Sequence, residues 1–223
     1  MGNNYRVDRE MVARDWPALV LLLLMFAAGA VTYPHLPAQV PAHWNLRGEV
    51  DSYFSRFWGA FALPLLAAGI YLGMLFSPCL DPKRNNYLRF LEAYRAVRIG
   101  LVLFLAVLYA LTLATALGGP ADLVSRVTPP ALGILFIITG NYLTRVRFNY
   151  LFGIRTPWTL ASEEVWRRTH RFAGPVFVAA GLVDVVTAFL PAPINFVIGV
   201  GAIMGAGAIT TLYSYLVYRR VNG

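Results

Sequence analysis

Long apolar runs with very few charges dominate this sequence, and they limit the folds that it can adopt. A helix needs about 20 apolar residues to cross the roughly 30 Å hydrocarbon core of a bilayer. Six runs approach that length, and the short fourth run is also compatible with a start nearer Leu123. They are approximately Pro17–Tyr33, Phe57–Phe76, Ile99–Leu117, Pro130–Leu143, Phe172–Leu190 and Ile194–Val217. Because only 13% of the residues are charged, against about 25% in a soluble domain, we predict an all-α polytopic membrane protein with six transmembrane helices, in which residues 1–223 form one domain.

The basic residues are distributed unevenly between the two sides of these runs. All but three of the 19 Lys and Arg residues lie in the two tails or in the connections that follow the second and fourth runs; the exceptions are Arg47, Arg56 and Arg126. Cytoplasmic loops carry such an excess of basic residues. Both termini are therefore predicted to be cytoplasmic, with an extracellular loop at 34–56 and a cytoplasmic loop at 144–171. The same rule accounts for the net charge of +8, so we expect contact with the lipid bilayer and no direct contact with nucleic acid.

The extracellular loop carries polar and aromatic side chains that could meet a ligand. Its prolines forbid a continuous helix and favour extended backbone, and Asn45 and Gly48 are turn formers. The residues expected to face an external ligand are His43, Trp44, Asn45, Gly48 and Asp51. A loop that only rests at the membrane surface, with its aromatic residues at headgroup depth, remains an alternative.

Neither a metal, a cofactor nor an enzyme activity is predicted. His35, His43, Glu49 and Asp51 share the extracellular loop, but their spacing matches no metal motif such as HExxH. The single cysteine, Cys79, excludes an intramolecular disulfide and a CxxC site. No nucleophile and base, and no set of metal ligands, are expected at one depth in the membrane.

The cytoplasmic loop contains the compact stretch GIRTPWTL, which begins at Gly153. Glycine permits a positive φ, and Thr156 before Pro157 is typical of a helix start. We expect a short interfacial helix near 162–171, capped by Ser162 and pinned at the membrane surface by the loop's two tryptophans. Two interpretations of the whole loop stay open, a structural clamp and a functional surface.

Two pairs of glycines have the spacing of helix-packing motifs. Gly69 with Gly73, and Gly201 with Gly205, lie four residues apart within apolar runs. Small residues at this spacing let neighbouring transmembrane helices approach closely. We predict that both pairs pack against other helices.

One carboxylate lies inside a predicted membrane span. Asp184 falls 12 residues into the fifth run, past the midplane toward the outside. Such a charge is costly and is by default a candidate functional group. It could carry a proton or bind a cation, or it could be a hydrogen-bonded packing residue.

Residues 140–174 resemble the carboxyl-terminal signature of the SdpI-type immunity proteins. The matching positions are Gly140, Asn141, Asn149, Gly153, Ile154, Arg155, Thr156, Pro157, Trp158, Thr159, Leu160, Trp166, Thr169, His170 and Gly174. The stretch LPAQVPAHWNLRGEVDSY in the extracellular loop is similar to a small domain of unknown function found at the start of the same proteins.

The resemblance implies a function in the bacterial cytoplasmic membrane. The best-known member of the family protects a bacterium from a secreted, membrane-active peptide toxin and holds a cytoplasmic autorepressor at the membrane. By resemblance, the expected partners are such a toxin and such a repressor, the latter at Asn141, Asn149, Gly153, Arg155, Thr156, Pro157, Trp158, Thr159, Trp166 and His170. An alternative is a transporter or proton-coupled exporter that uses Asp184.

Overall fold

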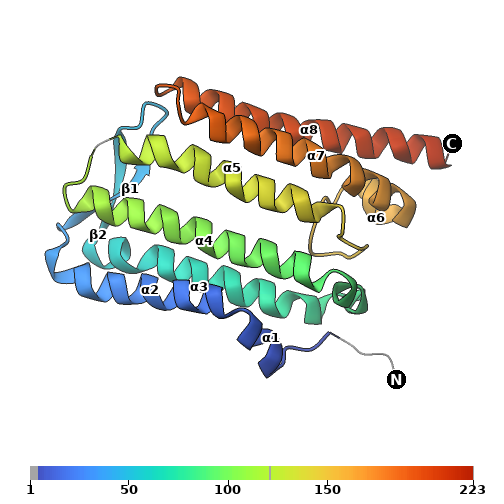
Figure 1. Ribbon diagram of the computed structural model, residues 1–223, viewed down its shortest axis with the longest axis horizontal. Helices are drawn as coiled ribbons and strands as arrows, with labels where there is room; N and C mark the ends of the chain where they lie inside the picture. The colour runs from blue at the N-terminus through green and yellow to red at the C-terminus, as the bar shows by residue number, and fades with distance from the viewer. Residues whose placement is uncertain (1–4, 121, 223) are drawn as a thin grey trace.

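The computed structural model describes residues 5–120 and 122–222, and it consists mostly of helices (Figure 1). Its elements are α1 (Arg9–Arg14), α2 (Trp16–Thr32), η1 (Tyr33–His35), β1 (Gln39–Trp44), β2 (Val50–Ser55), α3 (Arg56–Leu80), η2 (Arg84–Arg89), α4 (Leu91–Ala116), α5 (Leu123–Leu143), α6 (Pro157–Ala161), α7 (Glu163–Thr187) and α8 (Ile194–Asn222). Within the described residues, five helices are long and apolar enough to cross a membrane: α2, α3, α4, α5 and α8. The chain is therefore a mostly helical, multi-pass membrane protein.

The six long helices lie side by side and give the molecule two distinct ends (Figure 1). The strands β1 and β2 lie at one end, which we call the hairpin end. The opposite end, called the basic end, comprises residues 5–15, 81–91, 144–171 and 215–222. Helices α2, α3 and α4 pack together, as do α5, α7 and α8, and contacts between α4 and α5 join the two groups.

The closest helix pair is α5 with α7, and glycines make the close approach possible. A Cβ atom on Gly133 would lie 2.5 Å from the carbonyl oxygen of Gly181, and one on Gly140 would lie 2.7 Å from that of Gly174. Each pair has one glycine on α5 and one on the antiparallel helix α7. On each helix the two glycines lie seven residues apart. Side chains at these positions would force the backbones apart, so the four glycines set the spacing of this pair.

The glycines that the sequence singled out do not serve this purpose. Gly69, Gly73, Gly201 and Gly205 have open space where a side chain would stand, with nothing within 4 Å. The prediction that they pack against other helices of the chain is wrong. Four-residue spacing shows that small residues share a helix face, but it does not show which face meets a neighbour.

Two helix boundaries also differ from expectation. The short interfacial helix expected near 162–171 is wrong as a separate element, because these residues form the first turns of the continuous helix α7. Ser162 does cap that helix, since its side chain accepts a hydrogen bond from the amide of Val165. Helix α5 begins at Leu123, the alternative start, because Pro129 and Pro130 lie within the helix rather than at its beginning.

The loop at 34–56 contains secondary structure that was not predicted. Strands β1 and β2 form an antiparallel hairpin, which adds a two-stranded sheet to the mostly helical fold. Asn45 and Gly48 make the turn as predicted: the Asn45 side chain accepts from the amides of Arg47 and Glu49 at 2.8 and 3.1 Å, and Gly48 has a φ of 79°. The fully buried side chain of Val40 lies over Gly59, and this contact anchors the hairpin on α3.

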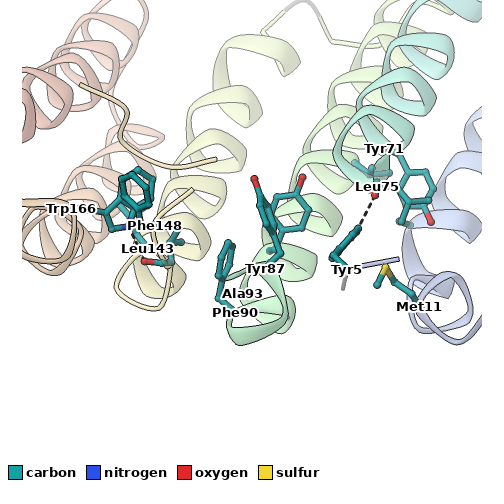
Figure 2. Packing of buried hydrophobic residues seen from close by; sticks show 14 of the residues in the cluster. Tyr5, Met11, Tyr71, Leu75, Tyr87, Phe90, Ala93, Leu143, Phe148 and Trp166 are labelled. Carbon is teal, nitrogen blue, oxygen red and sulfur yellow. Dashed lines mark hydrogen bonds between the residues drawn. The ribbon is translucent and has the colours of Figure 1, made fainter. Parts of the chain in front are cut away.

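The core at the basic end is rich in aromatic residues. Figure 2 shows it extending from Tyr5 through Tyr87 and Phe90 to Trp166. The hydroxyl of Tyr5 donates to the carbonyl of Leu75 at 3.0 Å and its ring meets that of Tyr87 edge to face. The amino-terminal segment is therefore packed into the same core as the loop at residues 144–162, which carries much of the family signature and which we call the signature loop.

Candidate functional sites

A cavity of about 270 Å³ lies beneath the hairpin, between the hairpin and the ends of α3, α4, α5 and α8. Its lining is mostly apolar. The residues that line it are Ala42, His43, Trp44, Asn45, Leu46, Gly48, Leu63, Leu108, Leu111, Thr112, Val124, Ser125, Thr128, Pro129, Asn195 and Phe196. A concave, apolar space with a few polar groups is the usual form of a ligand site.

The structure brings most of the predicted ligand-facing residues to this cavity. His43, Trp44, Asn45 and Gly48 line it. Asp51 does not; its Oδ1 lies 2.5 Å from Nδ1 of His43, an exposed pair that joins the two strands. The strand pairing is irregular on both sides of His43, and such bulges re-aim side chains locally.

Two residues that line the cavity carry unpaired polar atoms. Nε1 of Trp44 and Oγ1 of Thr128 are buried and have no hydrogen-bond partner within the described residues. An unpaired buried polar group costs about 1–3 kcal/mol, so a local rearrangement that let a ligand group pair with either atom would recover that free energy. The cavity as it stands is suited to an apolar side chain.

Sequence reasoning missed the helical half of this site. Leu63, Leu111 and Thr128 lie on three different helices, and their residue types do not distinguish them from lipid-facing positions. A polar residue, Asn195, follows the PAP connection and gives a weak signal; its side chain donates to the carbonyl of Ser125 at 2.9 Å and ties α8 to α5.

A buried polar cluster lies at the basic end, centred on Asn149 of the signature loop. Oδ1 of Asn149 accepts from the amides of Leu151 and Phe152 at 3.0 and 2.7 Å and lies 3.0 Å from the hydroxyl of Tyr87. Its amide group donates to the carbonyl of Arg147. Asn149 is fully buried, so these bonds satisfy a side chain that could not otherwise remain there.

Gly153, Trp166 and His170 interlock beside that cluster. Gly153 has a φ of 109°, as predicted, and a Cβ there would lie 2.5 Å from Nε2 of His170. The His170 and Trp166 rings stack at 4.1 Å, and the indole donates to the carbonyl of Val146 at 3.1 Å. Trp166 is 2% exposed, so the prediction that it pins a helix at the membrane surface is wrong.

The hydrogen bonds of His170 require a neutral ring. Nε2 accepts from the amide of Ile154 at 3.0 Å, so Nδ1 carries the proton that points to the carbonyl of Trp166 at 2.9 Å. A second ring proton would face the Ile154 amide. His170 precedes the apolar part of α7, which begins at Phe172, and burial lowers the pKa of its imidazole from 6.5 to about 4.

We expect acid to destabilise the protein through His170. The unfolded chain takes up the proton near pH 6.5 and the folded chain only near pH 4, so the stabilisation is complete above about pH 6.5 and falls by about 1.4 kcal/mol per pH unit between these values. Thermal unfolding in detergent at pH 7 and pH 5 measures this loss. In His170→Gln, whose side-chain oxygen can accept the same bond without titrating, the fall should be much smaller; equal falls would contradict the assignment.

The RTPWT stretch forms a helix start that is tied to α8. Thr156 caps α6, and Thr156 and Thr159 exchange side-chain and backbone hydrogen bonds in a capping box. The Thr156 hydroxyl also lies 3.0 Å from that of Ser214 on α8. Trp158 is half-buried and packs against Tyr215, with ring centroids 5.0 Å apart.

The two interpretations of the loop therefore apply to different residues. The buried polar and aromatic signature residues are Asn149, Thr156, Thr159, Trp166, Thr169 and His170, and they act as a structural clamp. Asn141, Arg155 and Pro157 are exposed, so they are the most accessible part of the signature. The Arg155 side chain donates to the carbonyl of Tyr150 at 3.2 Å.

Two buried acids at the basic end escaped the sequence reasoning. Asp81 accepts from the amide of Tyr150 at 2.9 Å and from the hydroxyl of Tyr87 at 3.0 Å, and so joins the end of α3 to the signature loop. Asp15 and Arg98 are both fully buried and pair at 2.5 Å. Both acids lie at helix ends, close in sequence to charged loop residues, so the sequence does not indicate that they are buried.

Asp184 is buried between α7 and α8. Its carboxylate faces Gly199 so closely that a side chain could not fit there, and Oδ2 has no hydrogen-bond partner among the described residues. The Thr187 hydroxyl donates to the backbone carbonyl of Asp184 at 2.6 Å. Asp184 does not line the cavity beneath the hairpin.

The fold and these two sites define a multi-pass helical membrane protein with a ligand-sized cavity at one end and a buried polar clamp at the other. Residues 145–214 match the SdpI/YfhL protein family, and residues 20–68 match a domain of unknown function, DUF1648. Over 206 residues the chain is 28% identical to the Immunity protein SdpI of Bacillus subtilis (strain 168), covering 92% of this chain and 96% of that protein. No solved structure gives a significant match. The resemblance to the SdpI-type immunity proteins is thereby confirmed.

The two matches overlap the two sites only in part. The hairpin lies within 20–68, and the buried residues of the clamp from Val146 to Ser214 lie within 145–214. The helical lining of the cavity from Leu108 to Pro129 lies outside both matches.

Proposed function

We propose that this chain is a non-enzymatic immunity protein that protects a bacterium from a secreted, membrane-active peptide toxin. The similarity to the immunity protein of Bacillus subtilis over nearly the whole of both chains is the observation that carries this proposal. The multi-pass fold is consistent with it, because a toxin that acts on membranes must be met at the membrane.

The proposed recognition site is the cavity beneath the hairpin. Its mostly apolar lining suits an apolar side chain of the toxin, and Trp44 and Thr128 each carry an unpaired polar atom that a local rearrangement would make available to a polar group. The cavity opens at the end that holds only three basic residues, Arg47, Arg56 and Arg126, which the distribution of charge assigns to the outside.

The proposed topology has six spans in the bacterial cytoplasmic membrane, with both termini in the cytoplasm. Helix α7 supplies the sixth span. Its first turns carry five charged residues and it contains Asp184, so its composition is less apolar than that of the other five helices. It nevertheless lies alongside α5 and α8 over their common length (Figure 1).

A second proposed role is to hold a cytoplasmic autorepressor at the membrane, and the exposed part of the signature loop supports it. Arg155 and Pro157 are exposed beside the half-buried Trp158. Replacing Arg155 with Ala should abolish recruitment of such a repressor while protection from toxin persists. Loss of the membrane protein itself from the cell would instead make Arg155 a structural residue.

The alternative of a transporter or proton-coupled exporter rests on Asp184. Its unpaired Oδ2 is the observation that favours this function, because a buried acid without a partner can exchange a proton. Substrate flux in proteoliposomes that depends on pH and is lost in Asp184→Asn would support the transporter and count against a purely protective role.

The test of immunity is survival of a toxin-sensitive bacterial host that expresses the full chain. The host is challenged with a panel of secreted membrane-active peptides, and cells with the empty vector serve as the reference. We expect at least one peptide to kill the reference cells at a concentration that the expressing cells survive. No gain in survival for any peptide, with the protein present in the membrane, would refute the proposal.

A further inference from the structure

A second, polar cavity of about 370 Å³ opens at the basic end, beside the signature loop. It lies between η2, the loop that follows α5, and the first turns of α7. Its charged lining residues are Lys83, Arg89, Arg147, Glu163, Glu164 and Arg167.

The charged residues that line this cavity differ in whether they have an oppositely charged partner. Glu164 is neutralised by Arg167 and by Arg168, with which it forms ion pairs. Glu163 has only a distant partner, Lys83, at 3.9 Å. Arg89 and Arg147 are exposed and have no carboxylate partner in the part of the chain that the structure describes. Two guanidinium groups are therefore free to bind an anion.

The cavity lies at the depth of the membrane surface. The apolar part of α7 begins at Phe172, five residues after Arg167, which is roughly 8 Å along the helix. Helix α3 ends at Leu80, which is 82% exposed and lies three residues before Lys83. Apolar helix segments that we assign to the membrane thus lie close in sequence to the basic residues of the cavity.

We propose that this cavity binds the phosphate of an anionic phospholipid headgroup, with Arg89 and Arg147 as the principal donors. Guanidinium groups present paired N–H donors that match phosphate oxygens. Basic pockets between membrane helices bind anionic headgroups in this way. The site requires neither the toxin nor the repressor, so it is independent of the function proposed above.

The experiment measures lipid binding to the purified full chain in detergent by native mass spectrometry. Phosphatidylglycerol is titrated against phosphatidylcholine, and separate arms add inorganic phosphate or a hexaglutamate peptide. The test variant is Arg89→Gln with Arg147→Gln. The matched control is Arg219→Gln with Arg220→Gln, which removes the same charge at the same end, from the last turns of α8 outside the cavity.

We expect the unmodified chain to retain phosphatidylglycerol in preference to phosphatidylcholine, and the test variant to bind phosphatidylglycerol about tenfold or more weakly. The control variant should change affinity by less than about threefold, because only unspecific attraction is lost. Equal losses in both variants, or equal binding of the two lipids, would overturn the proposal. Displacement of the lipid by inorganic phosphate would identify a free-phosphate site instead, and displacement by hexaglutamate would identify a site for an acidic protein segment.

Discussion

Replacing Gly181 with Leu is expected to prevent the protein from folding stably in the membrane. A Cβ at this position would lie 2.5 Å from the carbonyl oxygen of Gly133 and 2.9 Å from the amide nitrogen of Ile137. Both are backbone atoms of α5 and cannot move aside as a side chain would. Overpacking of a core typically costs about 1–3 kcal/mol, and a leucine forced between two helix backbones should exceed that range. Abundance in membranes and thermal unfolding in detergent measure the effect.

Two further variants make this test specific. Gly181→Ala adds only the clashing Cβ and should give an intermediate loss. Gly205→Leu adds the same side chain on α8, where nothing lies within 4 Å, and should leave abundance and unfolding temperature nearly unchanged. Similar losses for Gly181→Leu and Gly205→Leu would mean that close packing of α5 on α7 is not what makes the glycine necessary.

Replacing Arg98 with Met is expected to destabilise the protein by about 3–5 kcal/mol, because it leaves the carboxylate of Asp15 buried without its closest partner. The pair is fully buried, and the Tyr71 hydroxyl also donates to Asp15 at 3.2 Å. Arg95 lies 3.4 Å from the other carboxylate oxygen and compensates only in part. For a chain of this size the loss corresponds to a fall of roughly 10 °C in unfolding temperature.

A double-mutant cycle separates the contribution of the Asp15–Arg98 ion pair to stability from the effect of leaving one of the two charges buried alone. Asp15→Asn with Arg98→Met removes both charges and should recover most of the stability that Arg98→Met loses. Arg126→Met, which breaks the exposed ion pair with Asp122, is the control and should change stability by less than about 1 kcal/mol. If the double variant were as unstable as Arg98→Met alone, the buried charge of Asp15 would not be the cause.

The sequence was most informative where a local pattern of residues is compatible with few backbone structures. Long apolar runs predicted six membrane helices, and five helices among the described residues are long and apolar enough to be spans. Asn45 with Gly48 predicted the turn, and Thr156 with Pro157 predicted a helix start; both are present in the structure. The hairpin strands were not predicted, because the prolines of this loop indicated extended backbone but not its pairing. The real packing glycines of α5 and α7 were missed because they lie seven residues apart, and a search for pairs four residues apart does not find them.

The sites could be predicted only in part, for a similar reason. Polar residues in the hairpin, such as His43 and Trp44, are conspicuous and do line the cavity. Leu111 and Thr128 complete it, but they look like any other residues of an apolar helix. Asp15 precedes the first apolar run and Arg98 lies in the connection after the second, and nothing in the sequence indicates that tertiary packing buries them together. Residue type at one position does not show which residues pack around it.

The most direct test of the account is toxin survival of cells that express Thr128→Trp. This side chain fills the cavity beneath the hairpin and removes one of its two unpaired polar atoms. Met204→Trp, at a position of α8 that is 69% exposed, adds the same indole elsewhere and serves as the control at matched abundance. The account predicts that Thr128→Trp is present in the membrane but no longer protects, while Met204→Trp protects as well as the unmodified chain. Full protection by Thr128→Trp would contradict the assignment of the cavity as the recognition site.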